Sequence, residues 1–378
     1  MMIHSMNMPN SVRSKRGNVL FVGLFILGFG MLSIRSSHAQ SSVPAVENVF
    51  LITMDGFRWE ELFTGADPWL LENEAYTSDR EELKSKFWFD SAEERRKALM
   101  PFFWSEIAKN GQLYGNRHIG SEVNVSNTHV FSYPGYNEIL TGFADASIDS
   151  NDKIPNRNIT LLEELNKRKG FEGQVAAFGS WDVFPFIINE ERSGVPVNAG
   201  FESATGNDLS EKERWLNEVQ AQTPSPWTTV RLDVFTHNYA LEYVKRKQPR
   251  LVYISYGETD DFAHDKDYDQ YLNSAHRTDQ FIADLWHWVE QDPHYAGKTA
   301  FVIATDHGRG AEDRWIGHGG DWIGSENIWV ALLGPGIEAK GEMSGGKRLY
   351  QNQLAATVAA LLGESYSNRV AIGASIIE

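Results

Sequence analysis

Residues 301–310 read FVIATDHGRG, an apolar run that stops abruptly at an aspartate and a histidine. A short, nearly continuous apolar run is typical of a strand buried on both faces of a sheet. At the end of such a strand, a hydrophobic or simple turn residue would stabilise the fold better than an aspartate followed by a histidine. Asp306 and His307 therefore indicate a function. Residues 49–57, VFLITMDGF, repeat the arrangement with Asp55, although an Asp-Gly pair after a strand is often only a turn.

Strands and helices are predicted to alternate along most of the chain. The predicted strands are 49–54, 175–178, 251–256, 299–305 and 328–333. The predicted helices are 102–109, 134–141, 161–169, 230–246, 268–289 and 352–362. This alternation favours an α/β fold, a three-layer sandwich with a largely parallel central sheet flanked by helices. In such sheets ligands bind at the carboxyl ends of the strands.

Three further candidate ligands lie outside these two stretches. Asp260 and His264, in YGETDDFAHD (256–265), are four residues apart, and one helical turn would place them on the same face. The same stretch is rich in aspartate and could instead be a solvated acidic run. His318 lies in GHGG (317–320), which suits either a metal ligand on a loop or a plain turn.

Ser132 precedes Tyr-Pro-Gly and a predicted apolar helix. It could simply be the N-cap of that helix, with proline in the first turn. A helix N-terminus also favours an alkoxide and a bound phosphate, so Ser132 could be a nucleophile in the same position. Both interpretations can hold together.

Composition limits the partners and the compartment. The net charge is −16, which disfavours nucleic acid or an anionic membrane surface as a partner, so no nucleic-acid groove is expected. The chain has no cysteine, so a zinc site would need nitrogen and oxygen ligands. Residues 1–39 resemble a signal peptide, with a basic start, an apolar run at 19–32 and Ser-His-Ala before Gln40.

An uncleaved membrane anchor is the alternative for this segment, but its apolar run is short for a spanning helix. Residues 1–39 hold four positive and no negative charges, so cleavage would change the net charge from −16 to −20. Because residues 1–39 resemble a signal peptide, we expect export to a periplasm or the cell exterior, with no stable membrane partner after cleavage. Residues 40–378 are expected to form one catalytic domain, with insertions near 60–100 and 189–227 that could cap a site or be surface excursions.

Taken in order, these motifs resemble the alkaline phosphatase superfamily, and within it the type I phosphodiesterase and nucleotide pyrophosphatase branch. The motifs are a strand ending in Asp-Gly, a nucleophile followed by aromatic-Pro, D-x-x-x-H, the segment DPHYAGKTAFVIATDHG and a final His-Gly. The resemblance implies an alkaline-phosphatase-like fold, two divalent metal ions, zinc above all, and hydrolysis of a small phosphoric ester through a phosphoseryl intermediate on Ser132. It assigns the ligands of one zinc as Asp55, Ser132, Asp306 and His307, and those of the other as Asp260, His264 and His318.

The substrate-binding residues depart from the family pattern. Asn137 is the nearest amide after Ser132, and Trp181 follows the predicted strand 175–178 without any basic residue nearby in sequence. This gap favours a phosphodiester, or a phosphate carrying an organic group, over a bare monoester. Alternatives are a sulfatase, whose S-x-P-x spacing is present but with Tyr136 where its arginine should be, a phosphomutase of the same superfamily, and a non-catalytic exported metal-binding protein. The oligomeric state is left open.

Overall fold

The central element of the structure, a computed structural model that describes residues 46–377, is an eight-stranded sheet in the order β10-β2-β9-β7-β1-β6-β4-β5. The strands are β1 (Asn48–Met54), β2 (Gly111–Tyr114), β4 (Val175–Gly179), β5 (Val197–Ala199), β6 (Leu251–Tyr256), β7 (Thr299–Ala304), β9 (Val330–Leu333) and β10 (Gly341–Glu342). A second sheet contains β3 (Val123–Asn124), β8 (Asn327–Ile328) and β11 (Leu349–Tyr350).

The middle of the large sheet is parallel. Strand β1 pairs in parallel with β6 on one side and with β7 on the other, so Ile52 lies between Ile254 and Ile303. Strands β4 and β5 continue the parallel order, whereas β9 runs antiparallel to both β7 and β2. The predicted α/β fold with a largely parallel sheet is confirmed. As a result, the carboxyl ends of β1, β6, β7 and β4 lie at one edge.

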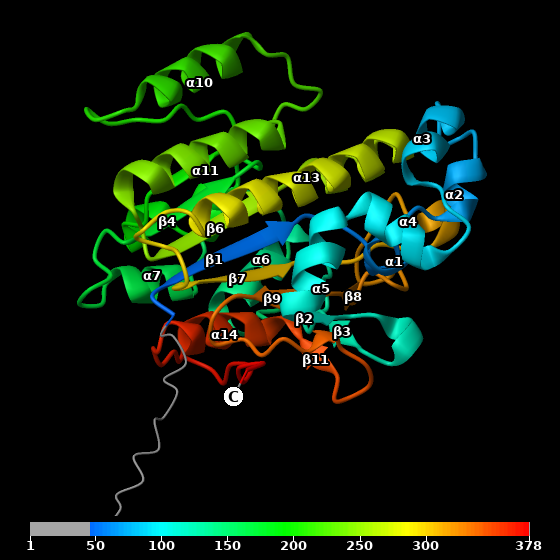
Figure 1. Cartoon of the computed structure of the whole chain (residues 1–378). Helices are drawn as coiled ribbons and strands as arrows, with labels where there is room; N and C mark the ends of the chain where they lie inside the picture. Colours follow the sequence, from blue (N-terminus) through cyan, green and yellow to red (C-terminus); the bar gives the residue numbers. More distant parts are fainter. Residues whose placement is uncertain (1–45, 378) are drawn as a thin grey trace, which may run out of the picture. The chain divides into compact units, whose positions relative to one another are not determined.

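Helices cover both faces of this sheet (Figure 1). Phe50 and Ile52 point toward a core shared with α11 (Asp233–Lys247) and α13 (Tyr268–Val289), while Val49 and Leu51 point toward a second core. The second core includes residues of α6 (Ser132–Thr141), α7 (Leu161–Asn166), α8 (Phe184–Ile187) and α14 (Leu354–Leu361). Strand side chains alternate between faces, so the continuous apolarity of β1 fills both cores and gives the three layers.

Two predicted elements differ from the observed ones. The predicted strand 328–333 divides into β8 and β9, which belong to different sheets, and between them the buried Trp329 donates its indole N–H to the carbonyl oxygen of Phe57 at 2.9 Å. The predicted helix 102–109 is a π-helical turn, Phe103–Ile107, followed by the short α5 (Ala108–Asn110).

The two stretches predicted as insertions are ordered. Residues 60–100 contain most of α1 (Trp59–Thr64), then α2 (Pro68–Glu72), α3 (Arg80–Phe87) and α4 (Ala92–Leu99). Residues 189–227 contain α9 (Glu190–Ser193), the sheet strand β5 and α10 (Glu211–Gln222). Part of the second stretch therefore belongs to the sheet. That either stretch caps a site remains a prediction.

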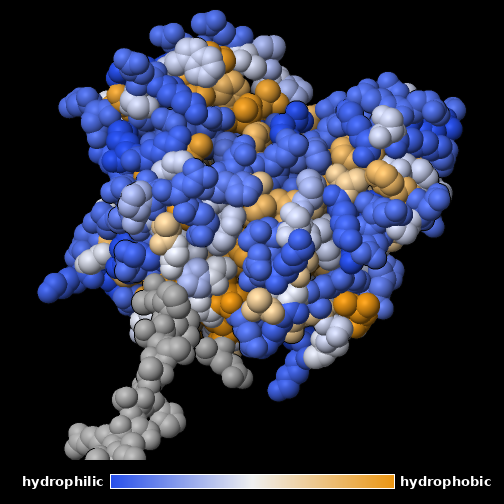
Figure 2. Space-filling view, viewed as in Figure 1, coloured by the Kyte–Doolittle hydropathy of each residue, from blue (hydrophilic) through white to orange (hydrophobic). Residues whose placement is uncertain are grey.

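Helix α10 of the second stretch packs over α11 (Figure 1). Figure 2 shows a largely hydrophilic face with apolar side chains gathered beneath α10. A cavity of about 420 Å³ lies there, lined by residues that include Phe178, Tyr239 and Tyr243. Within residues 46–377, no helix is both long and apolar enough to cross a bilayer. The predicted signal peptide lies outside these residues.

Candidate metal centre and nucleophile

Ser132 is the first residue of α6, and its side chain is buried. The N-cap is Phe131, so the interpretation of Ser132 as an N-cap serine is wrong and its hydroxyl is free for another role. The Ser132 Oγ lies 3.4 Å from His307 Nε2. Helix α6 can approach this closely because Gly135 has no side chain: a Cβ there would lie 2.6 Å from the carbonyl oxygen of Asp306.

Three predicted ligands at the ends of β1 and β7 converge on one point. His307 Nε2 lies 3.3 Å from Asp55 Oδ1 and 3.4 Å from Asp306 Oδ2. The turn after β1 is held by the backbone N–H of Gly56, which donates to Asp306 Oδ1 at 3.0 Å. Gly56 has a φ of +57°, and a Cβ there would clash with Asp260 Oδ1 at 2.6 Å, so glycine is required.

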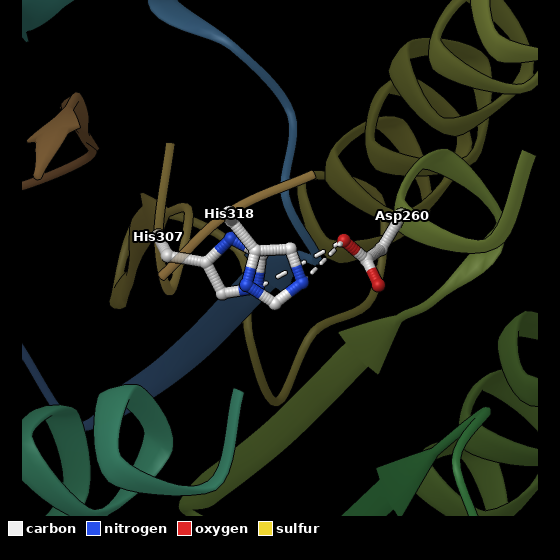
Figure 3. A group of neighbouring side chains, drawn as sticks. All are labelled: Asp260, His307 and His318. Atoms are coloured by element: carbon white, nitrogen blue, oxygen red, sulfur yellow. Dashed lines mark ion pairs between the residues drawn. The ribbon is translucent and has the colours of Figure 1, made fainter. Parts of the chain in front are cut away.

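The remaining predicted ligands form an adjoining group. Asp260 and His264 come from α12 (Glu258–His264), and His264 Nε2 lies 3.1 Å from both Asp260 Oδ2 and His318 Nε2. Figure 3 shows the His307 and His318 rings lying face to face with the Asp260 carboxylate directed toward their nitrogens. The ring centroids are 3.8 Å apart, and Asp260 Oδ1 lies 3.6 Å from His318 Nε2 and 3.9 Å from His307 Nε2. The structure thus brings all the predicted ligands together.

Burial and mutual repulsion shift the pKa values of the acidic residues. Burial raises the pKa of Asp55, and the nearby Asp260 raises it further. The pKa of Asp306 is raised well above its usual range by burial and then by Asp55. Burial alone would lower the pKa of His307, but Asp306 and Asp55 outweigh it and bring that pKa to about 9. Protonated His307 therefore supplies too little positive charge to keep both Asp55 and Asp306 ionised.

The residues fit divalent metal ions. Asp55 Oδ1 and Asp306 Oδ2 are buried and make no hydrogen bond, and the two share a single ion-pair partner, His307 Nε2, an arrangement that is costly unless a further cation binds them. Ligand atoms of Asp55, Asp306 and His307 lie within 4.8 Å of one another, and so do those of Asp260, His307 and His318. Such oxygen and nitrogen donors suit zinc. His307 belongs to both groups, and His264 adjoins the second.

Sequence reasoning missed two residues that hold the ligands. Arg309, fully buried, pairs with Asp260 through one guanidinium nitrogen and donates to the carbonyl oxygens of Trp315 and Ile316 at 2.6 and 2.8 Å. Tyr136 donates its hydroxyl to Asp55 Oδ2 at 2.8 Å. Tyr136 lies four residues after Ser132 on the same helix, so the i, i+4 spacing could have indicated it.

Tyr136→Phe is expected to weaken metal binding about 10- to 100-fold, because the hydroxyl orients Asp55 and such outer partners tune metal affinity by that amount. Zinc affinity is measured by competition with a chromogenic chelator. The matched control is Tyr239→Phe, which removes the hydroxyl of a buried tyrosine bonded to Asn217 on α10. Equal zinc affinity in Tyr136→Phe and wild type would show that Asp55 does not depend on this bond.

The two predicted substrate-binding residues are placed differently from the ligands. Asn137 is fully buried, donates to the carbonyl oxygen of Phe143 and accepts from Asn156 and Asn158, so its amide is engaged in a separate network. Trp181 lies beyond the carboxyl end of β4 and contacts Phe184. Asn151 is the amide that meets the start of α6: its Oδ1 accepts the backbone N–H of Tyr133 at 3.0 Å. Its sequence neighbourhood gave no signal for this contact.

Fold and site together define a metal-dependent hydrolase of the alkaline phosphatase superfamily. The chain belongs to the type I phosphodiesterase / nucleotide pyrophosphatase family, whose model matches residues 64–370. It is therefore an enzyme, a hydrolase of phosphoric esters. No curated protein matches the sequence.

Solved structures share the fold at low sequence identity. Wild-type alkaline phosphatase PafA is 12% identical, with a TM-score of 0.58 over 89% of this chain and 99% of that one. BT1596, a 2-O GAG sulfatase, is 13% identical, with a TM-score of 0.56 over 88% and 73%. The phosphonate monoester hydrolase SpPMH from Silicibacter pomeroyi is 12% identical, with a TM-score of 0.53 over 87% and 76%. At these identities the likeness supports the fold alone.

Proposed function

We propose that this protein is an exported two-metal hydrolase of small phosphoric esters in which the Ser132 hydroxyl is the nucleophile. The observation that carries the proposal is the position of Ser132 at the N-terminus of α6, with Oγ 3.4 Å from the histidine shared by both candidate metal groups. The predicted signal segment at 1–39 supports export. The ligand set would be Asp55, Ser132, Asp306 and His307 for one zinc and Asp260, His264 and His318 for the other.

The chemistry is a double displacement. Ser132 Oγ forms a bond to phosphorus while the bond to the leaving alcohol breaks, which gives a phosphoseryl enzyme; water then attacks the same phosphorus and releases Ser132. When bound, the two ions would lower the pKa of the attacking hydroxyl and neutralise charge on the phosphoryl oxygens.

The chain's own residues prepare the site for an anion. The positive end of the α6 dipole favours negative charge at Ser132. The Asn151 amide stands beside the backbone N–H of Tyr133 and could donate to a phosphoryl oxygen. Val130 has a φ of +53°, a strained value for a β-branched residue, and Asn127 Oδ1 holds it by accepting its N–H at 2.8 Å. The hydrogen bond to Asn127 holds this strained turn, which leads into Ser132.

A sulfatase reaction is the main rival. Its motif would place an arginine where this chain has Tyr136, and here the Tyr136 hydroxyl is bound to Asp55, inside the candidate metal group. Residue 136 therefore orients a candidate metal ligand and is not the arginine of the sulfatase motif. This difference favours phosphoric over sulfuric esters.

Zinc-loaded protein is expected to hydrolyse p-nitrophenyl phosphate or bis-p-nitrophenyl phosphate at least about 100-fold faster than p-nitrophenyl sulfate, because the site is built for phosphoryl transfer. Release of p-nitrophenolate measures all three rates, and Ser132→Ala is the control for contaminating activity. Faster sulfate than phosphate hydrolysis would favour the sulfatase. Zinc binding without hydrolysis of any ester would favour the non-catalytic metal-binding protein.

A further inference from the structure

We propose that two buried residues, Glu138 and Asn127, position the nucleophile and one of the candidate metal ligands together. They act through Val130, the strained residue two positions before Ser132, whose carbonyl oxygen contacts His318. This inference rests on the proposed function and adds a link between its nucleophile and its metal group. Glu138 and Asn127 are positioning residues, because they act through other residues and not on the substrate.

Glu138 is a carboxylate surrounded by hydrogen-bond donors. It lies on α6, on the same helix as Ser132, and its side chain is fully buried. Its Oε1 accepts the backbone N–H of Ser126 at 3.0 Å and the Ser126 hydroxyl at 2.7 Å. Its Oε2 accepts the backbone N–H and the side-chain amide of Asn127, both at 2.9 Å. Only a carboxylate offers acceptors on both oxygens to such a set of donors.

Asn127 connects Glu138 to the turn before Ser132. Its Oδ1 accepts the backbone N–H groups of His129 at 3.2 Å and of Val130 at 2.8 Å. The side-chain Nδ2 of Asn127 can only donate, so its bond to Glu138 leaves Oδ1 facing the turn. Glu138 therefore ensures that an acceptor meets the Val130 N–H. This bond helps to hold Val130 at its strained φ of +53°.

The carbonyl oxygen of Val130 is directed at a candidate metal ligand. His318 Nδ1 lies 3.4 Å from this oxygen, and because a carbonyl only accepts, Nδ1 carries the proton. In the neutral ring the lone pair is then on Nε2, the nitrogen that lies 3.1 Å from His264 Nε2 and 3.6 Å from Asp260 Oδ1. Metal-binding histidines are oriented by such a bond from the other ring nitrogen. Val130 thus prepares Nε2 of His318 to bind a metal ion.

The loop of His318 and the turn at 127–130 also meet through their backbones. A Cβ at Gly320, two residues after His318, would lie 2.5 Å from the carbonyl oxygen of Thr128, so only glycine allows this approach. A shift of the turn would therefore move both the loop of His318 and the start of α6. One hydrogen-bonded turn in this way couples the metal ligand to the nucleophile Ser132.

The test compares Glu138→Gln with Asp279→Asn. In Glu138→Gln an amide nitrogen would face donors that now meet a carboxylate, so the turn loses its support at almost constant volume. Asp279 is the matched control because it is also a buried carboxylate on a helix, α13, and accepts the backbone N–H groups of Phe102 and Phe103, but beside the other core.

Three quantities are measured on each protein. Competition with a chromogenic chelator gives the affinity for each zinc equivalent, and chemical denaturation gives the free energy of unfolding. Hydrolysis of p-nitrophenyl phosphate and bis-p-nitrophenyl phosphate at saturating zinc gives kcat and KM.

Glu138→Gln is expected to weaken the binding of one zinc equivalent about 10- to 100-fold and to leave the other within about threefold, because His318 belongs to one metal group. At saturating zinc, kcat should still fall about 10- to 100-fold with KM within about threefold of wild type, because Ser132 is displaced from its attacking position. Asp279→Asn should lose stability without either change.

Asn127→Ala, which removes the acceptor of the Val130 N–H, should reproduce both losses and decides the matter if Glu138→Gln does not fold. A loss of zinc affinity without a loss of kcat, the reverse, or equal losses in Asp279→Asn overturns the inference. If wild type hydrolyses neither ester, the proposed function fails, whereas the zinc affinity of Glu138→Gln still decides the link to His318.

Discussion

Ser132→Ala is expected to lower kcat by at least about 10³-fold, because it removes the atom that forms the covalent intermediate. Stability should change little: Phe131, not Ser132, is the N-cap of α6, so no capping bond is lost. Zinc content should stay close to that of wild type, since the other ligands remain. Steady-state hydrolysis, thermal melting and metal analysis on the same preparation measure the three quantities.

Two variants control this experiment. Ser132→Thr keeps a hydroxyl and should retain part of the activity. Ser274→Ala removes another buried serine, whose hydroxyl bonds to the carbonyl oxygen of Tyr271 within α13, and should leave turnover unchanged. Near wild-type rates in Ser132→Ala would mean that water attacks phosphorus directly.

Removal of the metal ions should abolish hydrolysis, and readdition of zinc should restore it. The expected loss exceeds about 100-fold, since buried Asp55 and Asp306 oxygens would be left without a cation and the phosphoryl charge without neutralisation. Relative to protein in zinc at 1,000 times the dissociation constant, the metal-free protein should also be less stable, by about 4 kcal/mol for each site. Chelation followed by activity assays and chemical unfolding measures both effects.

Metal stoichiometry sharpens this prediction. Wild type should bind close to two equivalents of zinc, and His264→Ala or His318→Ala should each reduce that number toward one, because both histidines adjoin Asp260 in the second group. His287→Ala, on the exposed face of α13, is the control. One calcium ion per chain, unaffected by His264→Ala, would point to the sulfatase instead.

The strands that the sequence predicted are those whose own residues fill both cores. The predicted strand 251–256 coincides with β6, and 49–54 lies within β1. The short β2, β5 and β10 were missed because their pairing, not their apolar pattern, defines them. The Gly-Gln-Leu-Tyr sequence of β2, for example, becomes a strand through antiparallel pairing with β9 and parallel pairing with β10. Such non-local pairing leaves little trace in a single sequence.

The candidate ligands that the structure brings together could be picked out in the sequence because their chemistry is unusual for their place. Asp306 and His307 end an apolar strand, and Asp260 and His264 share one helical turn. Residues that act through a distant contact had no such signal. Asn151, which contacts the start of α6, lies far from Ser132 in sequence, whereas the nearer Asn137 makes its hydrogen bonds in a separate network.

The most direct test of the central claim, attack by Ser132 on phosphorus, is the stereochemistry of hydrolysis. A chiral phosphorothioate diester is hydrolysed in ¹⁸O-labelled water, and the configuration of the product is determined by NMR. Each in-line displacement inverts phosphorus, so two displacements through a phosphoseryl intermediate predict net retention. This outcome does not require the intermediate to accumulate. Net inversion would contradict the account, because it requires a single displacement by water with no covalent bond to Ser132.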